Sequence, residues 1–401
     1  MEVLFISDVP LNTNYSGAEN VLHEQVAGLR SEGFNIYAIT RRNGQSGSHE
    51  NNDIDGVTDI CYIAARQRPL SFLFTLLKEP RKIFNRFKSK VQFSVSISHQ
   101  PFTVFPLLIM GSLRQIPKIY VFHSPNHEEY QLSMGFRKKH RGYLQILLRK
   151  AIERYCLERS QKIIVLSDYM KQKVIETHQI EEKKIVINPG GVDIERFKFQ
   201  NNRYHLKEEL NFPDCKIHLL TIRNLEKRMG IDNLLIALSK LKDKFTSFHL
   251  TIGGEGPERE KLEKMILTLG LKKEVTLRGF IPAERLPKYY GAADFFIIPT
   301  KRLEGFGLVT VESLACGTPV LGTPVGGTKE ILTGLNKELL FYDSTPEGMA
   351  EGIEKAIEIL VLDQKKYNDL RKKCHEYAKT RYSWNRHVRQ LKSIIMDASA
   401  V

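Results

Sequence analysis

Residues 294–317 read DFFIIPTKRLEGFGLVTVESLACG and join an apolar run to a helical pattern through a loop that contains two glycines. The run at 294–298 is short and apolar, as in a buried strand, and the residues after Gly307 are typical of a helix. A glycine loop at the start of a helix offers free backbone N–H groups and the positive end of the helix dipole. The stretch therefore predicts a strand, a loop that can bind phosphate or another anion, and a helix.

The same alternation of short β-branched runs and amphipathic stretches continues along both halves of the 401-residue chain. Apolar runs that alternate with helical segments indicate parallel sheets with crossover helices. We therefore predict two doubly wound, Rossmann-like α/β domains. The expected strands are residues 3–7, 35–40, 93–97, 118–122, 162–166, 184–187, 217–222, 248–252, 274–277 and 294–298, and the clearest helices are 19–32, 143–159, 230–241, 258–269 and 363–396.

The turn-forming cluster NPGGVD at residues 188–193 ends one of these strands and precedes a polar stretch. Clusters of Pro, Gly, Asn and Asp mark the loops between elements. We place the domain boundary here, with a first domain at residues 1–192 and a second domain at residues 193–379.

The chain carries a formal net charge of +14, which suggests an anionic partner such as nucleic acid, a phosphorylated ligand or an acidic membrane. Residues 51–150 contain 16 Lys and Arg against 6 Asp and Glu, so most of the excess lies there. The basic residues at 66–90 and 136–141 are mixed with Phe and Leu, which suits adsorption to anionic lipid headgroups. A solvated face around an ordinary helix explains the pattern about equally well. Nucleic acid is not expected as a partner, because the charge does not surround an aromatic stacking platform.

Five widely spaced cysteines, without a C-x-x-C or a Cys/His cluster, argue against a disulfide framework and a structural zinc site. The first residues lack a basic segment, and their apolar run is too short for a signal peptide. The longest apolar stretch, at 102–110, contains a proline and is too short to span a bilayer. We expect a cytoplasmic protein, peripheral at the inner face of the cell membrane if the basic segments bind lipid.

Two carboxylates, Glu304 and Glu312, flank the glycine loop. If the residues between them were fully helical, the carboxylates would lie about 12 Å apart along the axis. Such a distance suits contacts with two parts of an extended ligand and not a pair that shares one reacting atom. The structural alternative is a pair of solvated carboxylates that the helix dipole favours.

Arg223 and Arg228 follow the expected strand at 217–222. Ligands of open α/β sheets bind at the carboxyl ends of the strands. Arginine forks match phosphate oxygens and stay charged at any working pH, so both side chains could hold one diphosphate. Two surface arginines are the plainer interpretation of the pair taken alone.

Weaker signals lie at other strand ends. The loop at Gly17 starts a helix, His123 directly follows the strand at 118–122, and glycines at 253–256 and 279 also follow strands. A lone histidine of this kind is more often structural than ligand-binding. The chain contains no G-x-G-x-x-G after its first strand, no G-x-x-x-x-G-K-[ST] and no H-E-x-x-H, so nicotinamide, P-loop and zincin chemistries lose their main support.

Together these motifs resemble those of the retaining family 4 glycosyltransferases, which have the GT-B fold. The likeness is strongest at residues 223–330, where Glu304 to Glu312 fits the family's paired-glutamate motif. The family more often has Gly-Arg-Leu and a later Lys-Gly, where this chain has Arg223-Asn224-Leu225 and then Arg228, which keeps the positive charge. Further matches are residues 253–257, 279–281 and 315–330 and, less specifically, 16–19, His123, 189–193 and 382–384.

The resemblance implies a nucleotide-sugar donor bound in a cleft between the domains, chiefly by the second. It assigns Arg223 and Arg228 to the donor diphosphate. It assigns Glu312 to the ribose hydroxyls and Glu304 to the donor sugar, while His123 completes the site from the first domain. The expected catalytic residues are Glu304, His123, Arg223 and Arg228, and the expected substrate-binding residues are Gly17, Gly254, Gly279, Phe280, Gly305, Phe306, Gly307, Leu308 and Glu312.

The resemblance further implies transfer with retention to a glycan, a glycolipid or a lipid-linked acceptor, and UDP is the favoured donor nucleotide. No cofactor and no metal are expected, because the arginines would stabilise the charge on the leaving phosphate. Part of the final helix, at 380–401, is expected to pack back on the first domain. The alternative to an enzyme is a catalytically inactive subunit that binds sugar nucleotides or serves as a membrane-associated scaffold.

Overall fold

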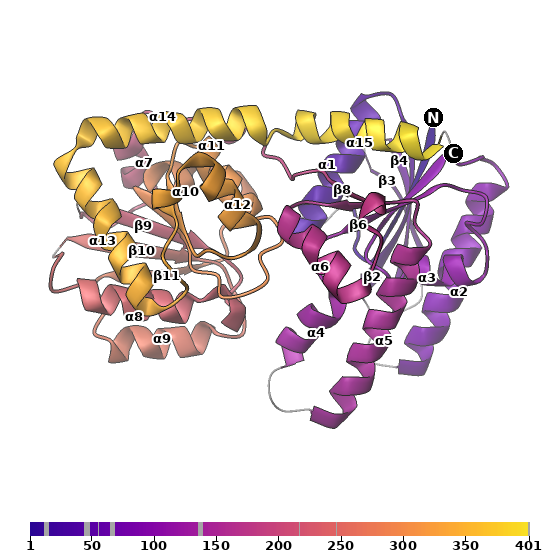
Figure 1. Cartoon of the computed structure of the whole chain (residues 1–401), viewed down its shortest axis with the longest axis horizontal. Helices are drawn as coiled ribbons and strands as arrows, with labels where there is room; N and C mark the ends of the chain where they lie inside the picture. Colours follow the sequence, from indigo (N-terminus) through magenta and orange to yellow (C-terminus); the bar gives the residue numbers. More distant parts are fainter. Residues whose placement is uncertain are drawn as a thin grey trace. The chain divides into compact units, whose positions relative to one another are not determined.

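The computed structural model describes residues 1–11, 16–43, 49–54, 56–64, 69–134, 139–215, 217–245 and 247–399. The chain divides into two compact units, one made of Met1–Pro189 with Trp384–Val401 and the other of Gly190–Ser383. Figure 1 shows a sheet flanked by helices in each unit. Two α/β domains with parallel sheets were predicted from the alternation of the sequence, and the structure confirms them.

The strands of the first unit are β1 (Glu2–Ser7), β2 (Asn35–Asn43), β3 (His49–Ile54), β4 (Val57–Ala64), β5 (Val95–His99), β6 (Lys118–Phe122), β7 (Lys162–Val165) and β8 (Ile185–Ile187). They form one sheet in the order β3-β4-β2-β1-β5-β6-β7-β8. Every pair is parallel except β3–β4. β1 and β5 are buried because helices cover both faces of such a sheet, and β1 accordingly contains an apolar run, whereas β5 (VSISH) also buries two serines and a histidine.

The antiparallel pair β3–β4 was not predicted. The sequence of β3, HENNDI, is polar and shows no alternation of apolar and polar residues, so its pairing with β4 leaves no local signal.

The helices of the first unit are α1 (Gly17–Ser31), α2 (Pro69–Lys88), α3 (Val104–Ile109), α4 (Asn126–Met134), α5 (Lys139–Glu158), α6 (Asp168–His178) and, from the end of the chain, α15 (Trp384–Ser399). α15 lies beside α1 (Figure 1) and buries Val388, Leu391 and Ile395 in the core of this unit. Gly28 allows the close approach, because a Cβ there would lie 2.2 Å from Cγ2 of Val388. The last helix is thus part of the first unit's core.

The second unit contains β9 (Ile217–Ile222), β10 (Phe248–Gly253), β11 (Val275–Gly279), β12 (Phe295–Ile298) and β13 (Val320–Gly322), and the helices α7 (Arg203–Glu209), α8 (Ile231–Leu241), α9 (Arg259–Thr268), α10 (Leu286–Ala292), α11 (Leu308–Ala315), α12 (Gly326–Leu335), α13 (Pro346–Leu362) and α14 (Gln364–Arg381). The strand order is β11-β10-β9-β12-β13, and all pairs are parallel. The chain leaves β9 in one direction to β10 and β11 and later returns to its other side with β12. Ligands of open α/β sheets bind at such a reversal of strand order.

One helix was expected at residues 363–396, and this prediction is wrong. α14 and α15 are separate helices, because the backbone of Tyr382 and Ser383 between them bonds to Val192. The N–H of Val192 donates to the carbonyl of Tyr382 at 2.7 Å, and Ser383 forms a β-bridge with Val192. Because Tyr382 and Ser383 form these contacts with Val192, they interrupt the helical backbone between Arg381 and Trp384.

Across the residues that the structure describes, no helix has both the length and the apolar character needed to cross a bilayer.

Candidate active site

The switch point between β9 and β12 brings Arg223 and Glu304 together. Arg223 follows β9 directly, and Glu304 lies in the loop after β12. Nη2 of Arg223 donates a hydrogen bond to Oε2 of Glu304 and another, at 3.2 Å, to Oγ1 of Thr300. The Thr300 hydroxyl also lies 3.1 Å from Oε2 of Glu304. Arg223 and Glu304 are only 9% and 8% exposed, so the charges form a buried ion pair.

Each member of this pair keeps a polar atom unused. Within the described part of the chain, no residue forms a hydrogen bond with Nη1 of Arg223 or with Oε1 of Glu304. The protein contacts all go to Nη2 and to Oε2. The ion pair therefore holds both side chains in place while a cationic donor and an anionic acceptor stay available to a ligand.

The backbone under Arg223 depends on the glycines after β10. Gly254 has φ +119, and a Cβ there would lie 1.9 Å from the carbonyl oxygen of Arg223. Arg223 N–H donates to the carbonyl of Gly253, and Gly254 N–H donates to that of Gly279. Gly254 and Gly279 thus position Arg223 by close backbone packing, whereas the neighbouring Phe280 is largely exposed.

The loop that carries Glu304 rests on the start of α12. Gly326 has φ +59, and a Cβ there would lie 2.0 Å from the carbonyl oxygen of Glu304. Gly327 N–H donates to the same carbonyl at 3.0 Å. These two glycines belong to a family match in the sequence but were not predicted as site residues.

α11 begins only at Leu308, after Gly307 with φ +93. The residues from Glu304 to Gly307 are therefore a loop, and the helical spacing of about 12 Å between the two glutamates does not apply. Gly305 lies in this loop, and the buried ring of Phe306 packs against Tyr382 in a T-shaped arrangement, so Phe306 anchors the loop by packing.

Arg228 also contacts the loop that carries Glu304, through a hydrogen bond to the backbone of Leu303. It lies in a short 3₁₀ turn, Lys227–Met229. Its Nε donates to Oε2 of Glu226 at 2.9 Å, and its Nη1 donates to the carbonyl of Leu303 at 2.9 Å. Leu303 has φ +58, a region that non-glycine residues rarely adopt, so the hydrogen bond from Arg228 stabilises an unfavourable backbone conformation just before Glu304.

Glu312 lies in α11 and is buried. Its Oε2 accepts a hydrogen bond at 2.9 Å from the hydroxyl of Tyr290, which comes from α10. Burial raises the pKa of Glu312 above its ordinary value, and the Tyr290 hydrogen bond opposes that shift. Tyr290 carried no sequence signal, because nothing local distinguishes it from any other buried aromatic residue.

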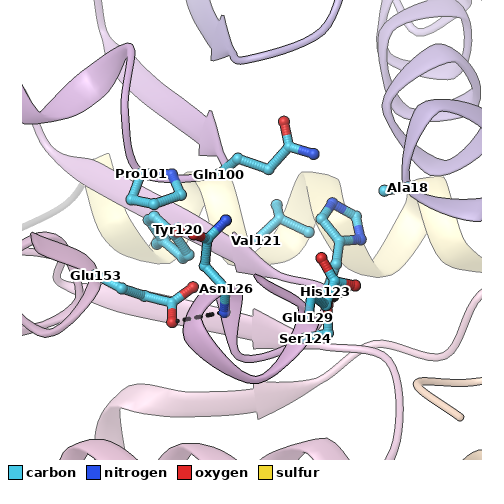
Figure 2. Close-up of a pocket in the computed structure, with 10 residues that line it drawn as sticks. All are labelled: Ala18, Gln100, Pro101, Tyr120, Val121, His123, Ser124, Asn126, Glu129 and Glu153. Atoms are coloured by element: carbon cyan, nitrogen blue, oxygen red, sulfur yellow. Dashed lines mark hydrogen bonds between the residues drawn. The ribbon is translucent and has the colours of Figure 1, made fainter. Parts of the chain in front are cut away.

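Gly17 and His123 belong to the first unit. Gly17 starts α1, where Ser16 and Glu19 form a reciprocal capping box. His123 follows β6 and lies 3.0 Å from His99 through Nε2 and Nδ1. Burial lowers the pKa of His123 to about 4, so its ring is neutral near pH 7. The ring lies at a cavity of about 50 Å³. The residues that line this cavity are drawn in Figure 2: Ala18, Gln100, Pro101, Tyr120, Val121, His123, Ser124, Asn126, Glu129 and Glu153.

One group in the described residues has the composition of a metal site. His127, Glu153 and His178 are buried, and one ligand atom from each lies within 4.8 Å of the others. Oε2 of Glu153, however, already accepts hydrogen bonds at 3.1 Å from the N–H of Asn126 and from Nε2 of His178. Asn126 is the first residue of α4, so this carboxylate stabilises the start of that helix.

The fold and the site define a two-domain α/β protein with a buried arginine–glutamate pair at a topological switch point. Two family models match the chain, "Glycosyl transferases group 1" over residues 202–381 and "Glycosyltransferase Family 4" over residues 15–196. The chain belongs to family 4 of the glycosyltransferases, as its motifs indicated.

Relatives found by sequence agree with this assignment. The chain is 30% identical over 248 residues to a D-inositol 3-phosphate glycosyltransferase of Corynebacterium jeikeium, which covers 59% of this chain and 57% of that protein. It is 23% identical over 320 residues to the alpha-monoglucosyldiacylglycerol synthase of Streptococcus pneumoniae, covering 76% of this chain and 67% of that protein. The first match thus spans little more than half of that relative.

Two solved structures share the fold over nearly the whole chain. Sucrose-phosphate synthase from Thermosynechococcus elongatus has a TM-score of 0.82 at 19% identity, covering 100% of both chains. Anabaena HepE, solved in complex with UDP-glucose, has a TM-score of 0.75 at 17% identity, covering 99% of this chain and 100% of that one. The expected GT-B fold is confirmed.

Proposed function

We propose that this chain transfers a sugar from a nucleotide-sugar donor, with a UDP-sugar favoured, to a glycan, a glycolipid or a lipid-linked acceptor. The observation that carries the proposal is the buried pair of Arg223 and Glu304, with a polar atom of each left unused. A diphosphate oxygen matches the free Nη1 of Arg223, and a donor-sugar hydroxyl matches the free Oε1 of Glu304.

Positive charge at this site would stabilise the negative charge of the leaving diphosphate, as a metal ion does in other enzymes. Arg223, Arg228 and the amides at the start of α11 surround the loop with groups suited to a leaving diphosphate. Such groups stabilise charge that develops in the transition state without reorganising, and this supports transfer without a metal or another cofactor. Oε1 of Glu312 is the atom that would accept hydrogen bonds from the ribose, because Tyr290 already occupies Oε2.

We propose that the reaction retains the anomeric configuration. The acceptor oxygen bonds to the anomeric carbon on the face from which the diphosphate departs, and the bond from that carbon to the phosphate oxygen breaks. The acceptor's proton passes to the leaving phosphate. Glu304, held by a guanidinium and close to a hydroxyl, would orient the sugar and stabilise its positive charge.

The first unit suits an acceptor that is presented by a membrane. A groove beside α2 combines apolar and basic side chains, which come from α2 (Phe74, Leu77, Lys78, Arg81, Lys82 and Asn85) and from the end of α3 (Met110). Phe74 is 72% exposed, and Leu144 on α5 is 73% exposed. Basic residues next to exposed apolar ones favour the surface of an anionic bilayer. Residues 66–68 and 136–138 of the two basic segments lie outside the described residues.

A thermal-shift screen against UDP, GDP and ADP, and against their sugars, tests donor binding. A ligand at 100 times its Kd should stabilise the native state by about 2.7 kcal/mol. Transfer is then measured with the donor that binds. Arg223→Gln and Glu304→Gln should each reduce turnover strongly, and Arg302→Gln, which removes an exposed charge two residues from Glu304, should not.

If none of the nucleotides raised the melting temperature, the assignment of this site to donor binding would be contradicted. Donor binding without turnover on many acceptors would instead favour the inactive, scaffold-type subunit.

Sedimentation with liposomes tests whether the protein binds to an anionic membrane. Vesicles rich in anionic lipid should carry the protein down at low salt, and Arg81→Gln with Lys82→Gln should release it. Lys372→Gln with Lys373→Gln removes the same charge from exposed positions of α14 and should have little effect. Equal behaviour of the two double variants would show that α2 is not the binding surface.

A further inference from the structure

A continuous line of hydrogen bonds runs through the core of the first unit to His123. It starts at the carbonyl of Pro189, which lies 2.7 Å from Nδ1 of His387. Nε2 of His387 is 3.0 Å from Nε2 of Gln25, and Oε1 of Gln25 is 3.1 Å from Nε2 of His99. Nδ1 of His99 is 3.0 Å from Nε2 of His123. Gln25, His99 and His387 are at most 1% exposed.

The chemistry of the groups determines the direction of this relay. A carbonyl only accepts, so Nδ1 of His387 carries a proton, and the neutral ring must accept at Nε2 from the Gln25 amide nitrogen. The oxygen of that amide then faces His99, whose Nε2 must donate. Nδ1 of His99 is left with a lone pair, so Nε2 of His123 must donate to it.

The opposite orientation of the Gln25 amide would require His387 to donate from both ring nitrogens and therefore to be a cation. Burial lowers the pKa of His387 to about 4 and that of His99 well below its ordinary value. The rings are therefore neutral at physiological pH, and one set of tautomers satisfies every contact. Asn188 supports His387 from the side, with its amide nitrogen 3.2 Å from the carbonyl of that residue.

We propose that Gln25, His99 and His387 are positioning residues that hold His123 in the Nε2–H tautomer. Nδ1 of His123 is then an unprotonated acceptor for a substrate hydroxyl, and no described residue bonds to it. His123 is one of the residues that line the cavity of Figure 2. The inference rests on the proposed transferase function, with His123 as one of its expected site residues, and adds that this ring accepts a hydrogen bond and does not donate a proton at Nδ1.

Three buried polar side chains, Gln25, His99 and His387, are not needed merely to fill the core of the first unit. Buried polar groups cost free energy unless all of them are paired, and apolar side chains would fill the same volume more simply. The far end of the relay also has a particular place in the chain. Pro189 is the last residue of the first unit before the chain leaves it, and His387 lies three positions after Trp384, where the chain returns.

Long-range ¹⁵N–¹H correlation spectra of the ligand-free protein report the tautomer of each histidine directly. The His123 signals are assigned by their loss in His123→Asn. In the wild type we expect a protonated Nε2 and a bare Nδ1. Gln25→Leu and His387→Leu should convert His123 to a mixture of tautomers, whereas His387→Gln, which can still donate to Pro189 and accept from Gln25, should leave it unchanged.

Tyr62→Phe is the matched control, because it removes another buried hydrogen bond of the same unit, from Tyr62 to Thr103, without touching the relay. With a working donor, Gln25→Leu should lower kcat/KM about tenfold, as expected for one lost hydrogen bond. His387→Gln and Tyr62→Phe should stay near wild type. The proposal would be overturned if Nδ1 of His123 were protonated in the wild type, or if the tautomer of His123 were the same in Gln25→Leu as in the wild type. Because the spectra need no donor, such a result is distinct from failure of the transferase function.

Discussion

The carboxylate of Glu304 lies against the guanidinium of Arg223, 81 residues earlier in the chain, and the pair is buried at the carboxyl ends of β9 and β12. Each side chain orients the other, and Thr300 lies beside both. An ion pair in this setting is costly to break, because either partner left alone would be an uncompensated buried charge.

Arg223→Met should therefore destabilise the protein by about 3–5 kcal/mol even without ligand, because Glu304 keeps a buried charge that has lost its partner. Combining Arg223→Met with Glu304→Gln should recover a large part of that loss, since the carboxylate is then gone. Urea unfolding of the wild type, both single variants and the double variant measures the coupling. Additive effects of the two changes would show that the pair does not contribute as a unit.

Gly326→Ala should disturb the loop at Glu304. The substitution combines an unfavourable φ of +59 with a Cβ only 2.0 Å from the carbonyl oxygen of Glu304. Gly33→Ala is the control, because Gly33 also has a positive φ, +83, but a Cβ there would meet nothing within 4 Å. The conformational penalty common to both is about 1–2 kcal/mol. Gly326→Ala should lose more stability than Gly33→Ala, by thermal or urea unfolding, and it alone should lower turnover.

Donor affinity should fall on acidification at a higher pH than an ordinary glutamate would produce. Burial raises the pKa of Glu312, and protonation would remove the acceptor charge proposed for the ribose hydroxyls. Tyr290→Phe removes a hydrogen bond to the charged form, so it should raise this pKa further and move the loss of affinity to higher pH. Calorimetric titration with the donor nucleotide between pH 7.5 and about 5 measures the shift. Glu312→Gln should bind more weakly at neutral pH and lose this dependence, and a retained dependence would assign the titration to another group.

Stability should fall as the pH decreases from about 6.5 to about 4. Burial lowers the pKa of His387 to about 4, below the ordinary value of 6.5, so in this window the unfolded chain binds the proton and the folded chain does not. Such a histidine contributes a slope of up to about 1.4 kcal/mol per pH unit, and its stabilisation is complete only above the unfolded pKa. Urea unfolding at several pH values should give a shallower slope for His387→Gln than for the wild type. Equal slopes would mean that His387 is protonated in the folded protein.

Much of the fold was accessible from local patterns. The alternation of apolar runs and amphipathic stretches predicted two parallel α/β domains, and a strand was expected within two residues of β1, β6, β9 and β12. The predictions failed where local pattern and tertiary context differ. β3 is too polar to be recognised as a strand, and the break between α14 and α15 depends on Val192, which is remote in sequence.

The chemical types at the site could be predicted from local sequence: an arginine after one strand, a glutamate in a glycine loop after another, and a histidine at the end of a third. These signals are local, because strand periodicity and glycine turns are set by a few neighbouring residues. The folded chain was needed to show that Arg223 pairs with Glu304, that Tyr290 bonds to Glu312, and that Gln25 and His387 are linked to His123 through His99. Those partners depend on strand order and on the packing of the last helix against the first, and buried hydrogen bonds between such distant residues leave no spacing for a sequence pattern to reveal.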